Sequence, residues 1–462
     1  MATESNQQDY RLPADSFIAT TAWKVSAAVA AVGLLGSIAG FAADSNRFGY
    51  SYLFGFFAVA TLMLGAMFMV LIQHMTAGHW GVTSRRIFEL FMIGAPVIAL
   101  LALPIIAGSG AGAFDMYDEW RRPASPGANH GVPDGGGEEP GHHGALTFGA
   151  STAHAQGHGE AAAGEHGGHE AHAHTPQEQA LHHATLEKKH IWLNGHAWTT
   201  RSIFYVLAWC IIALFYFRTS TRQDETKDKL LTPKMQNMSY LSSFVFGLTL
   251  TFAAFDWVMS LEPAWYSTIF GVIIFGGSAI GMLAVACLIG IHMHKNNLAG
   301  GAVNGEHIND LSRLMFGFIC FWTYVQFSQW MLIWYAGIPE EATWFHRRWQ
   351  GGFEWVTLTL IFGHFVAPFF LLISRVQKRN LGWLSKMCLW LLAMHLLDLY
   401  WFVVPQAHTP AQLDASVVYD LAALLFCGGV FFTFVLKGFA RFPLIPVGDP
   451  RLSRSLHHHQ TY

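Results

Sequence analysis

Charged residues are scarce in this sequence. Only 12% of its 462 residues are Asp, Glu, Lys or Arg, against about 25% in soluble domains. The hydrophobic share is 52%, with 37 Phe and 17 Trp, and aromatic residues collect in membrane spans and at membrane interfaces. The composition excludes an ordinary soluble enzyme. A net charge of −3 without any basic run excludes a nucleic-acid partner.

Cysteine is also scarce. The five cysteines each stand alone in an apolar stretch, at Cys210, Cys287, Cys320, Cys388 and Cys427. There is no C-x-x-C-H motif for covalent haem and no cysteine quartet for an iron–sulfur cluster. We therefore expect no cofactor bound by this chain and treat the cysteines as small buried hydrophobes. A cleavable signal is not expected, since residues 1–20 are polar.

Long apolar runs dominate the remainder. A bilayer core about 30 Å thick needs roughly 20 apolar residues in helical form. The sequence predicts an all-α integral membrane protein with about ten transmembrane helices. They are expected at 22–43, 49–74, 86–108, 200–218, 238–261, 266–292, 311–335, 352–376, 383–405 and 413–438, the fourth being the shortest.

The distribution of Lys and Arg predicts the orientation. With the N-terminus inside, 19 of these residues lie on the inner side and 8 on the outer side, as the positive-inside rule favours. We expect two cytoplasmic tails, 1–21 and 439–462, and two membrane blocks, 22–108 and 200–438. The loop 109–199 is then periplasmic, and the chain lies in a bacterial inner membrane as a multi-pass protein.

The 109–199 loop contains a low-complexity insertion rich in His and Gly. Thirteen of the 25 histidines lie between Arg122 and Thr200. Such a composition buries too little apolar surface to fold alone, so we expect a disordered, solvated insertion. Loose binding of Zn²⁺ or Cu²⁺ is the alternative interpretation, and no specific metal ligands are assigned.

Ionisable residues inside predicted spans are costly and indicate function. His395 and Asp398 are spaced i, i+3 and so share a helix face, and a histidine titrates near neutral pH. We expect a proton path. Its candidate residues are Asp256, His364, His395, Asp398, Tyr400 and Asp420 toward the outside, and Glu89 and His74 toward the inside. The alternative is a set of satisfied hydrogen bonds between helices, worth roughly 0.6 kcal/mol each.

Four segments carry a family resemblance. They read FDWVMSLEPAWYSTIFGV (255–272), QFSQWMLIWYAGIPEE (326–341), LDLYWFVVP (397–405) and FPLIPVGDPRLSRSL (442–456). They resemble the NrfD-like, polysulfide-reductase-type membrane subunits of alternative complex III, a quinol:cytochrome c oxidoreductase, and in particular the second of its two such subunits. The similarity runs through most of the chain outside 123–185.

The resemblance implies two four-helix bundles plus two extra helices, with both termini cytoplasmic. It implies a hetero-oligomeric respiratory complex with a second NrfD-like subunit, multihaem and monohaem cytochrome c subunits, an iron–sulfur subunit and small membrane subunits. A terminal oxidase is a further candidate partner, and lipids surround the chain. The substrate of the complex would be quinol or menaquinol, with haem c and iron–sulfur clusters in the partner subunits. This chain would be a scaffold and proton conductor.

Two other functions fit the same residues. The chain could bind quinone itself, with His364 or His395 accepting a proton and Trp401 flanking the ring. It could also be a stand-alone proton-coupled transporter for metal ions collected by the His-rich loop. Against this, the sequence shows neither a clear internal repeat nor a broken midplane helix, and no acidic or histidine ligand pair spaced one helical turn apart for Zn²⁺.

Overall fold

A computed structural model describes residues 10–111, 113–121, 186–408 and 411–458. Every regular element in these ranges is a helix. The predicted His/Gly insertion at 123–185 lies entirely outside the described residues. Residues 1–9 and 459–462 of the two predicted tails also lie outside them.

Among the described residues, nine helical segments are long and apolar enough to cross a membrane. They are η1 and α1 (Ile18–Ala43), α2 (Ser45–Met75), α3 and α4 (Val82–Ser109), α7 (Gly195–Thr226), α8 and η2 (Leu231–Leu261), α9 (Phe270–Lys295), α12, η4 and α13 (Phe353–Leu372), α15 and η5 (Leu381–Ala407) and α16 (Val417–Arg441). The predicted span at 311–335 is α10 (Gly305–Ala336), equally long but richer in Trp, Tyr and Gln. The prediction of an all-α integral membrane protein is confirmed.

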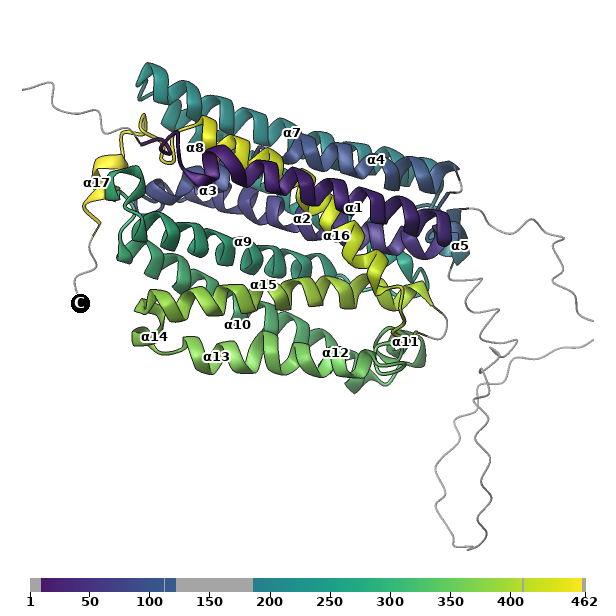
Figure 1. Ribbon diagram of the computed structural model, residues 1–462. Helices are drawn as coiled ribbons and strands as arrows, with labels where there is room; N and C mark the ends of the chain where they lie inside the picture. The colour runs from purple at the N-terminus through teal and green to yellow at the C-terminus, as the bar shows by residue number, and fades with distance from the viewer. Residues whose placement is uncertain (1–9, 112, 122–185, 409–410, 459–462) are drawn as a thin grey trace, which may run out of the picture.

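Short helices cap the two ends of the bundle. They are α5 (Asp118–Arg121), η3 (Leu298–Gly301), α11 (Pro339–Arg347), α14 (Arg375–Arg379) and α17 (Leu452–Leu456). We call the end with α14 and α17 the tail end and the end with α5 and α11 the loop end (Figure 1). The backbone N–H of Leu444 donates to the carbonyl of Tyr10 at 2.8 Å. Both ends of the described chain therefore meet at the tail end of the bundle.

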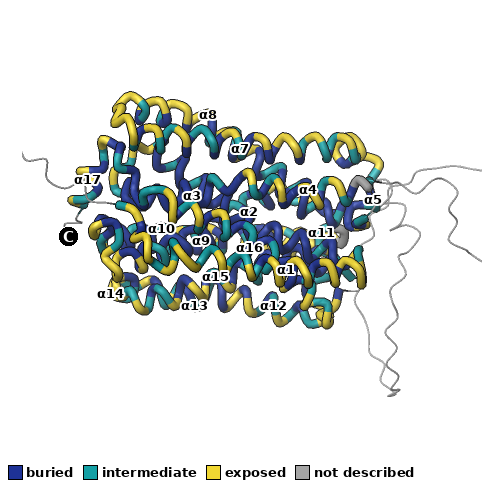
Figure 2. Tube along the Cα trace, turned by 45° about the horizontal axis from the view of Figure 1, so that its top comes forward, coloured by how far each residue is buried: buried dark blue, intermediate teal, exposed yellow. Residues whose placement is uncertain are grey.

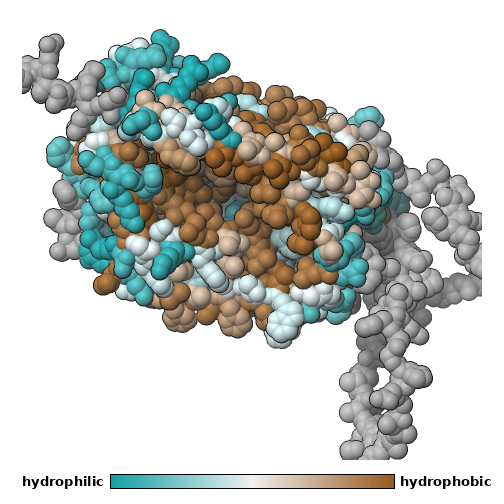
Figure 3. Space-filling view, in the orientation of Figure 1, coloured by the Kyte–Doolittle hydropathy of each residue, from teal (hydrophilic) through white to brown (hydrophobic). Residues whose placement is uncertain are grey.

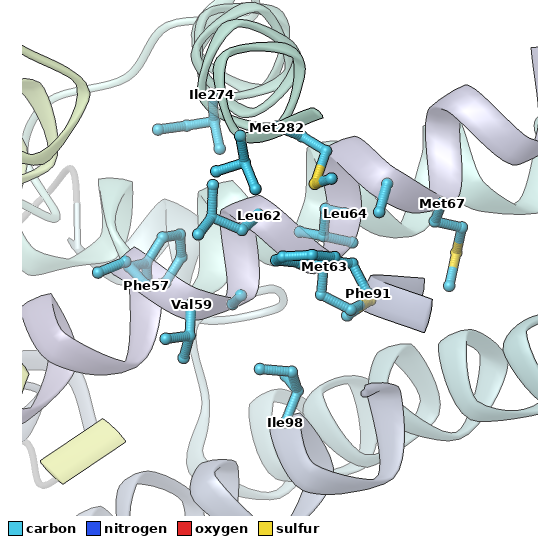
Figure 4. Packing of buried hydrophobic residues seen from close by; sticks show 14 of the residues in the cluster. Phe57, Val59, Leu62, Met63, Leu64, Met67, Phe91, Ile98, Ile274 and Met282 are labelled. Atoms are coloured by element: carbon cyan, nitrogen blue, oxygen red, sulfur yellow. The ribbon is translucent and has the colours of Figure 1, made fainter. Parts of the chain in front are cut away.

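Helix α2 lies at the centre of the bundle and packs against α16, α9, α3, α8 and α15. Figure 4 shows its Phe57, Leu62 and Met63 among residues of α3, α4 and α9. Small residues let the backbones approach closely, as is usual between membrane helices. A Cβ added at Gly65 would lie 2.2 Å from the Ser278 carbonyl oxygen. This central position explains why α2 is buried almost along its whole length (Figure 2).

The lateral surface of the bundle is apolar. Large hydrophobic side chains are exposed along it, including Leu35, Ile211, Phe244 and Phe370. Figure 3 shows the resulting band of hydrophobic residues, with hydrophilic ones gathered near α17. A monomer that exposed so much apolar surface to water would aggregate, so this surface faces lipid.

The fourth span differs most from its predicted length. The sequence predicts this span at 200–218, as the shortest of the ten. In the structure it is helix α7, which runs for 32 residues from Gly195 to Thr226. Asn194 caps its start by accepting a hydrogen bond from the Ala197 N–H at 2.8 Å, and Lys227 ends it with a positive φ of 56°. Hydropathy detects only the lipid-embedded part of a helix. The polar turns at both ends of α7 are stabilised by contacts with other loops.

Candidate functional site

Asp256, near the end of α8 at the loop end, is fully paired. Arg201 of α7 donates from Nε to Oδ2 and from Nη2 to Oδ1, both at 2.8 Å. The Tyr205 hydroxyl donates to Oδ2 at 2.7 Å and the Trp192 indole N–H to Oδ1 at 2.9 Å. Four hydrogen bonds from three side chains, two of them from one bidentate guanidinium, hold this carboxylate in a fixed position. Its geometry is that of an anchor between α7 and α8.

Asp420, in the first turn of α16, is paired in a similar way. Arg47 of α2 donates to both of its oxygens, at 2.9 and 2.8 Å, and the Ser51 hydroxyl donates at 2.6 Å. Tyr400 of α15 lies within hydrogen-bonding reach of the same carboxylate. The Arg47 Nε also donates to Ser416 at 2.7 Å, and Ser416 donates in turn to Asp414. Asp420 is therefore the inner end of a polar string.

The surface end of this string is a histidine–carboxylate pair. His408 Nε2 lies 3.2 Å from Asp414 Oδ2, and both side chains are partly exposed. Burial opposes ionisation of Asp414 and by itself would raise its pKa. Hydrogen bonds from Ser416 and the nearby His408 lower its pKa below the usual value. The string thus connects the half-buried Tyr400 to water at the loop end.

Glu89 belongs to a buried ionic network at the tail end. It contacts Arg85 at 3.2 Å and Arg86 at 2.9 Å and accepts a hydrogen bond from Ser220 at 2.9 Å. Arg86 also pairs with Asp224, at the end of α7. Helices α3 and α7 meet here, and Glu89 is a paired structural charge.

Asp449 completes this network from the C-terminal segment. It pairs with Arg85 at 2.7 Å and with Arg451 at 3.2 Å. Burial raises the cost of its charge, but the guanidinium groups of Arg85 and Arg451 outweigh it and hold the pKa well below its usual range. The carboxylate is thus ionised at neutral pH and fastens the tail to α3.

His74 lies near the tail end of α2, beside the ionic network. Its ring is fully buried, with its centroid 5.3 Å from that of Tyr216. Neither ring nitrogen has a hydrogen-bond partner within the described ranges. Its position is compatible with proton entry from the tail end, while its contacts are those of a packed aromatic ring.

His395 and Asp398 form the centre of the buried cluster, as their spacing predicts. A Cβ added at Gly277 of α9 would lie 3.4 Å from His395 Nδ1 and 3.6 Å from Asp398 Oδ2. The two side chains therefore lie together over the same glycine. His395 Nε2 is 3.0 Å from the Thr61 hydroxyl of α2. Within the described part of the chain, neither His395 Nδ1 nor Asp398 Oδ1 has a hydrogen-bond partner.

His364 joins the cluster from a distorted segment. It lies on η4 (Ile361–Val366), one π-helical turn between α12 and α13, and such turns frequently mark functional sites. Its ring centroid is 4.1 Å from the Trp322 ring of α10, at an interplanar angle of 33°. His364 lies close to His395, and the Trp322 indole lies close to the Asp398 carboxylate. Among the described residues, both His364 nitrogens and Trp322 Nε1 lack partners.

Trp401 does not join the histidines as the quinone interpretation expects. Its indole N–H donates to Thr357 at 2.8 Å, and the buried Arg348 guanidinium lies 4.8 Å from its ring. Trp401 lines a groove of about 590 Å³ between α10 and the α12–α13 span, which we call the aromatic groove. His395 instead lines a groove of about 390 Å³ beside α1 and α16, the aliphatic groove. His364 borders the aromatic groove only through Trp322.

The sequence did not lead us to predict three partners of the candidate residues, namely Arg201, Arg47 and Trp322. Arg201 and Arg47 carry a usable signal, since each lies at the same predicted membrane side as its aspartate. Trp322 carries no such signal, because its contact with His364 depends on how α10 packs against η4.

Among the described residues no group of three or more His, Cys, Asp or Glu is placed to hold a metal ion.

The cluster of His364, Trp322, His395 and Asp398 is thus the candidate site, distinguished by unpaired polar atoms in a buried setting. Comparison with known proteins does not extend this assignment to a family. No family model matches the chain, and no match was found among the curated proteins.

Proposed function

We propose that this chain is a non-redox membrane subunit of a quinol:cytochrome c oxidoreductase of the alternative complex III type, and that it conducts protons through its central cluster. The sequence resemblance motivates the complex. The proton role is supported by one contrast. The buried acids outside the cluster have arginine partners, whereas several polar atoms of the cluster have no hydrogen-bond partner among the described residues.

That contrast separates the candidate residues into two groups. Asp256, Asp420 and Glu89 each have an arginine partner, so their charges are compensated at fixed positions. Asp398 is equally buried, with no basic partner in the ion pairs of the described residues. A buried polar group without a partner costs about 1–3 kcal/mol. Groups of this kind in a membrane are retained where they exchange protons or bind ligands.

An exit toward the loop end would start at Tyr400 of α15, which lies near Asp420. Because residues two apart face different sides of a helix, water would have to carry the proton from Asp398 to Tyr400. From there Ser51, Ser416 and the His408–Asp414 pair extend to the surface. In this proposal Arg47 holds the Asp420 carboxylate in position, while hydroxyls and water carry the proton. The tail-end half offers His74, beside the network around Glu89.

The remaining roles belong to partners in this proposal. Quinol or menaquinol is the substrate of the complex, haem c and iron–sulfur clusters sit in the partner subunits, and the loop end is periplasmic in the bacterial inner membrane. Exposed aromatic side chains at the loop end support a docking face there, among them Trp334, Tyr335 and Trp355. The packing of α7 with α8 and of α9 with α10 and α15 is compatible with two helix bundles.

The test has two stages. The chain is first purified gently from its own membranes, and reduced haem c bands with quinol:cytochrome c activity are expected in the eluate. The complex is then placed in vesicles, and protons moved per electron are measured with a pH dye. Asp398→Asn should lower this ratio at least twofold without loss of subunits. Asp115→Asn, an exposed acid at the loop end, is the matched control.

Either stage can overturn the proposal. A colourless, solitary protein would remove the respiratory assignment and favour a transporter. An intact Asp398→Asn complex with an unchanged proton-to-electron ratio would remove the proton role and leave a scaffold.

A further inference from the structure

The aromatic groove is a built feature of the lipid-facing surface. It runs along α10 from Cys320 to Trp330 and along the α12–α13 span from Thr357 to Phe369. Its lining residues Tyr324, Phe327 and Ile361 are exposed on the lateral surface, so the groove opens toward the bilayer. Its volume of about 590 Å³ falls within the roughly 300–1,000 Å³ of small-molecule sites.

The lining distinguishes this groove from two other grooves on the described surface. Nine of its fifteen lining residues are aromatic, and four of these are tryptophans: Trp322, Trp330, Trp349 and Trp401. The aliphatic groove has one Phe and the ring of His395 among fourteen lining residues, and the third groove, beside α8, has four Phe among thirteen. An acyl chain packs equally well against aliphatic or aromatic walls. Planar conjugated rings gain most from offset or edge contacts with aromatic walls.

A few polar groups interrupt the aromatic walls. The Thr357 hydroxyl accepts the Trp401 N–H at 2.8 Å and donates to the Arg348 carbonyl at 2.9 Å. Thr323 and Gln326 line the α10 side. Apolar walls with a small number of polar groups are the usual composition of a site that orients a mostly apolar ligand.

Trp322 forms the wall between the groove and the central cluster. Its side chain lines the groove, and its ring lies 4.1 Å from that of His364. Its indole nitrogen is buried and has no hydrogen-bond partner among the described side chains and backbone. Only the Trp322 indole would therefore separate a ring bound in the groove from His364.

We propose that the aromatic groove binds a membrane-soluble molecule with a planar conjugated ring and a long apolar tail, of the isoprenoid quinone class. Assigning a quinone to the groove rests on the function proposed above. The ring lies between Trp322 and Trp401, and the tail leaves along Phe365 and Phe369 toward lipid. The site differs from a pocket at His364 or His395, because Trp322 separates the groove from His364 and His395 faces another groove.

Photoaffinity labelling of the complex purified from its own membranes tests this site. The probe is a naphthoquinone with an isoprenoid tail and an azide on the ring. Labelled peptides are identified by mass spectrometry, with excess unlabelled naphthoquinone or excess phosphatidylethanolamine as competitors. We expect labelling at 320–330 and 357–369 that the quinone suppresses at least tenfold and the phospholipid does not.

Matched variants locate the site. Ile361→Phe enlarges a half-exposed side chain of the aromatic groove and should reduce labelling at least fivefold. Leu425→Phe enlarges a residue of the aliphatic groove and should leave it unchanged. Labelling that moves with Leu425→Phe, or that phospholipid suppresses as well as quinone does, overturns the proposal.

The outcome is separable from that of the proposed function. Haem bands and proton movement with no labelling in the groove would remove the quinone site alone. Specific labelling of a chain that purifies without cytochromes would retain the site and remove the complex.

Discussion

The rings of His364 and Trp322 lie 4.1 Å apart, and this contact joins the lipid-facing groove to the buried ionisable cluster. His364 reaches it from a π-helical turn, and Trp322 from the middle of α10. Because of this contact, His364 is fully buried although only the Trp322 side chain separates it from the groove.

Replacing this indole should expose the histidine. Trp322→Leu shortens the wall, so we expect His364 to react at least fivefold faster with diethyl pyrocarbonate, read by mass spectrometry of the peptide. Trp322→Phe keeps a ring over His364 and should leave the rate near that of the parent protein. His346, which is exposed, serves as the internal reference. Equal His364 rates in all three proteins would contradict the shielding role.

Two glycines of α9 offer a graded perturbation of the cluster. A methyl group at Gly281 would lie 2.8 Å from His395 Cδ2, so Gly281→Ala must displace the imidazole ring. At Gly277 the nearest atom of His395 is 3.4 Å away, an ordinary contact. We expect Gly281→Ala to lower the proton-to-electron ratio of the vesicle-bound complex at least twofold, and Gly277→Ala to leave it nearly unchanged. The reverse order would show that the His395 ring position does not matter.

The sequence predicts the spans well and their partnerships poorly. Hydropathy identifies lipid-embedded runs because each must be apolar over its own length, and the i, i+3 spacing places His395 with Asp398 because both lie on one helix. The pairing of Asp256 with Arg201 depends instead on how α7 and α8 align. That Asp398 has no basic partner depends on the side chains that all of the neighbouring helices place around it. Such properties belong to packing and leave no local pattern.

The ion pair at the loop end should show an asymmetric cost. Arg201→Met leaves the fully buried Asp256 carboxylate without its cation, and breaking a buried pair in this way costs about 3–5 kcal/mol. Asp256→Asn leaves Arg201, which is 19% exposed, able to reach water. We expect Arg201→Met to lower the free energy of unfolding in mild detergent more than Asp256→Asn does. The double variant should recover part of that loss. Equal and additive effects would indicate that the pair is not coupled.

The tail-end network predicts a pH dependence carried by Asp449. Its pKa is lower in the folded protein than in the unfolded chain, so its contribution to stability is present above the unfolded value of about 3.9. This contribution is lost as the pH falls through that value toward the folded pKa. We expect the melting temperature of the detergent-solubilised protein to fall between pH 6 and pH 3, with early proteolysis of the segment after Phe442. Asp449→Asn should already melt lower at pH 7 and show a shallower fall, whereas the exposed-site variant Asp115→Asn should follow the parent curve. A parent-like pH profile in Asp449→Asn would mean that other groups hold the tail against α3.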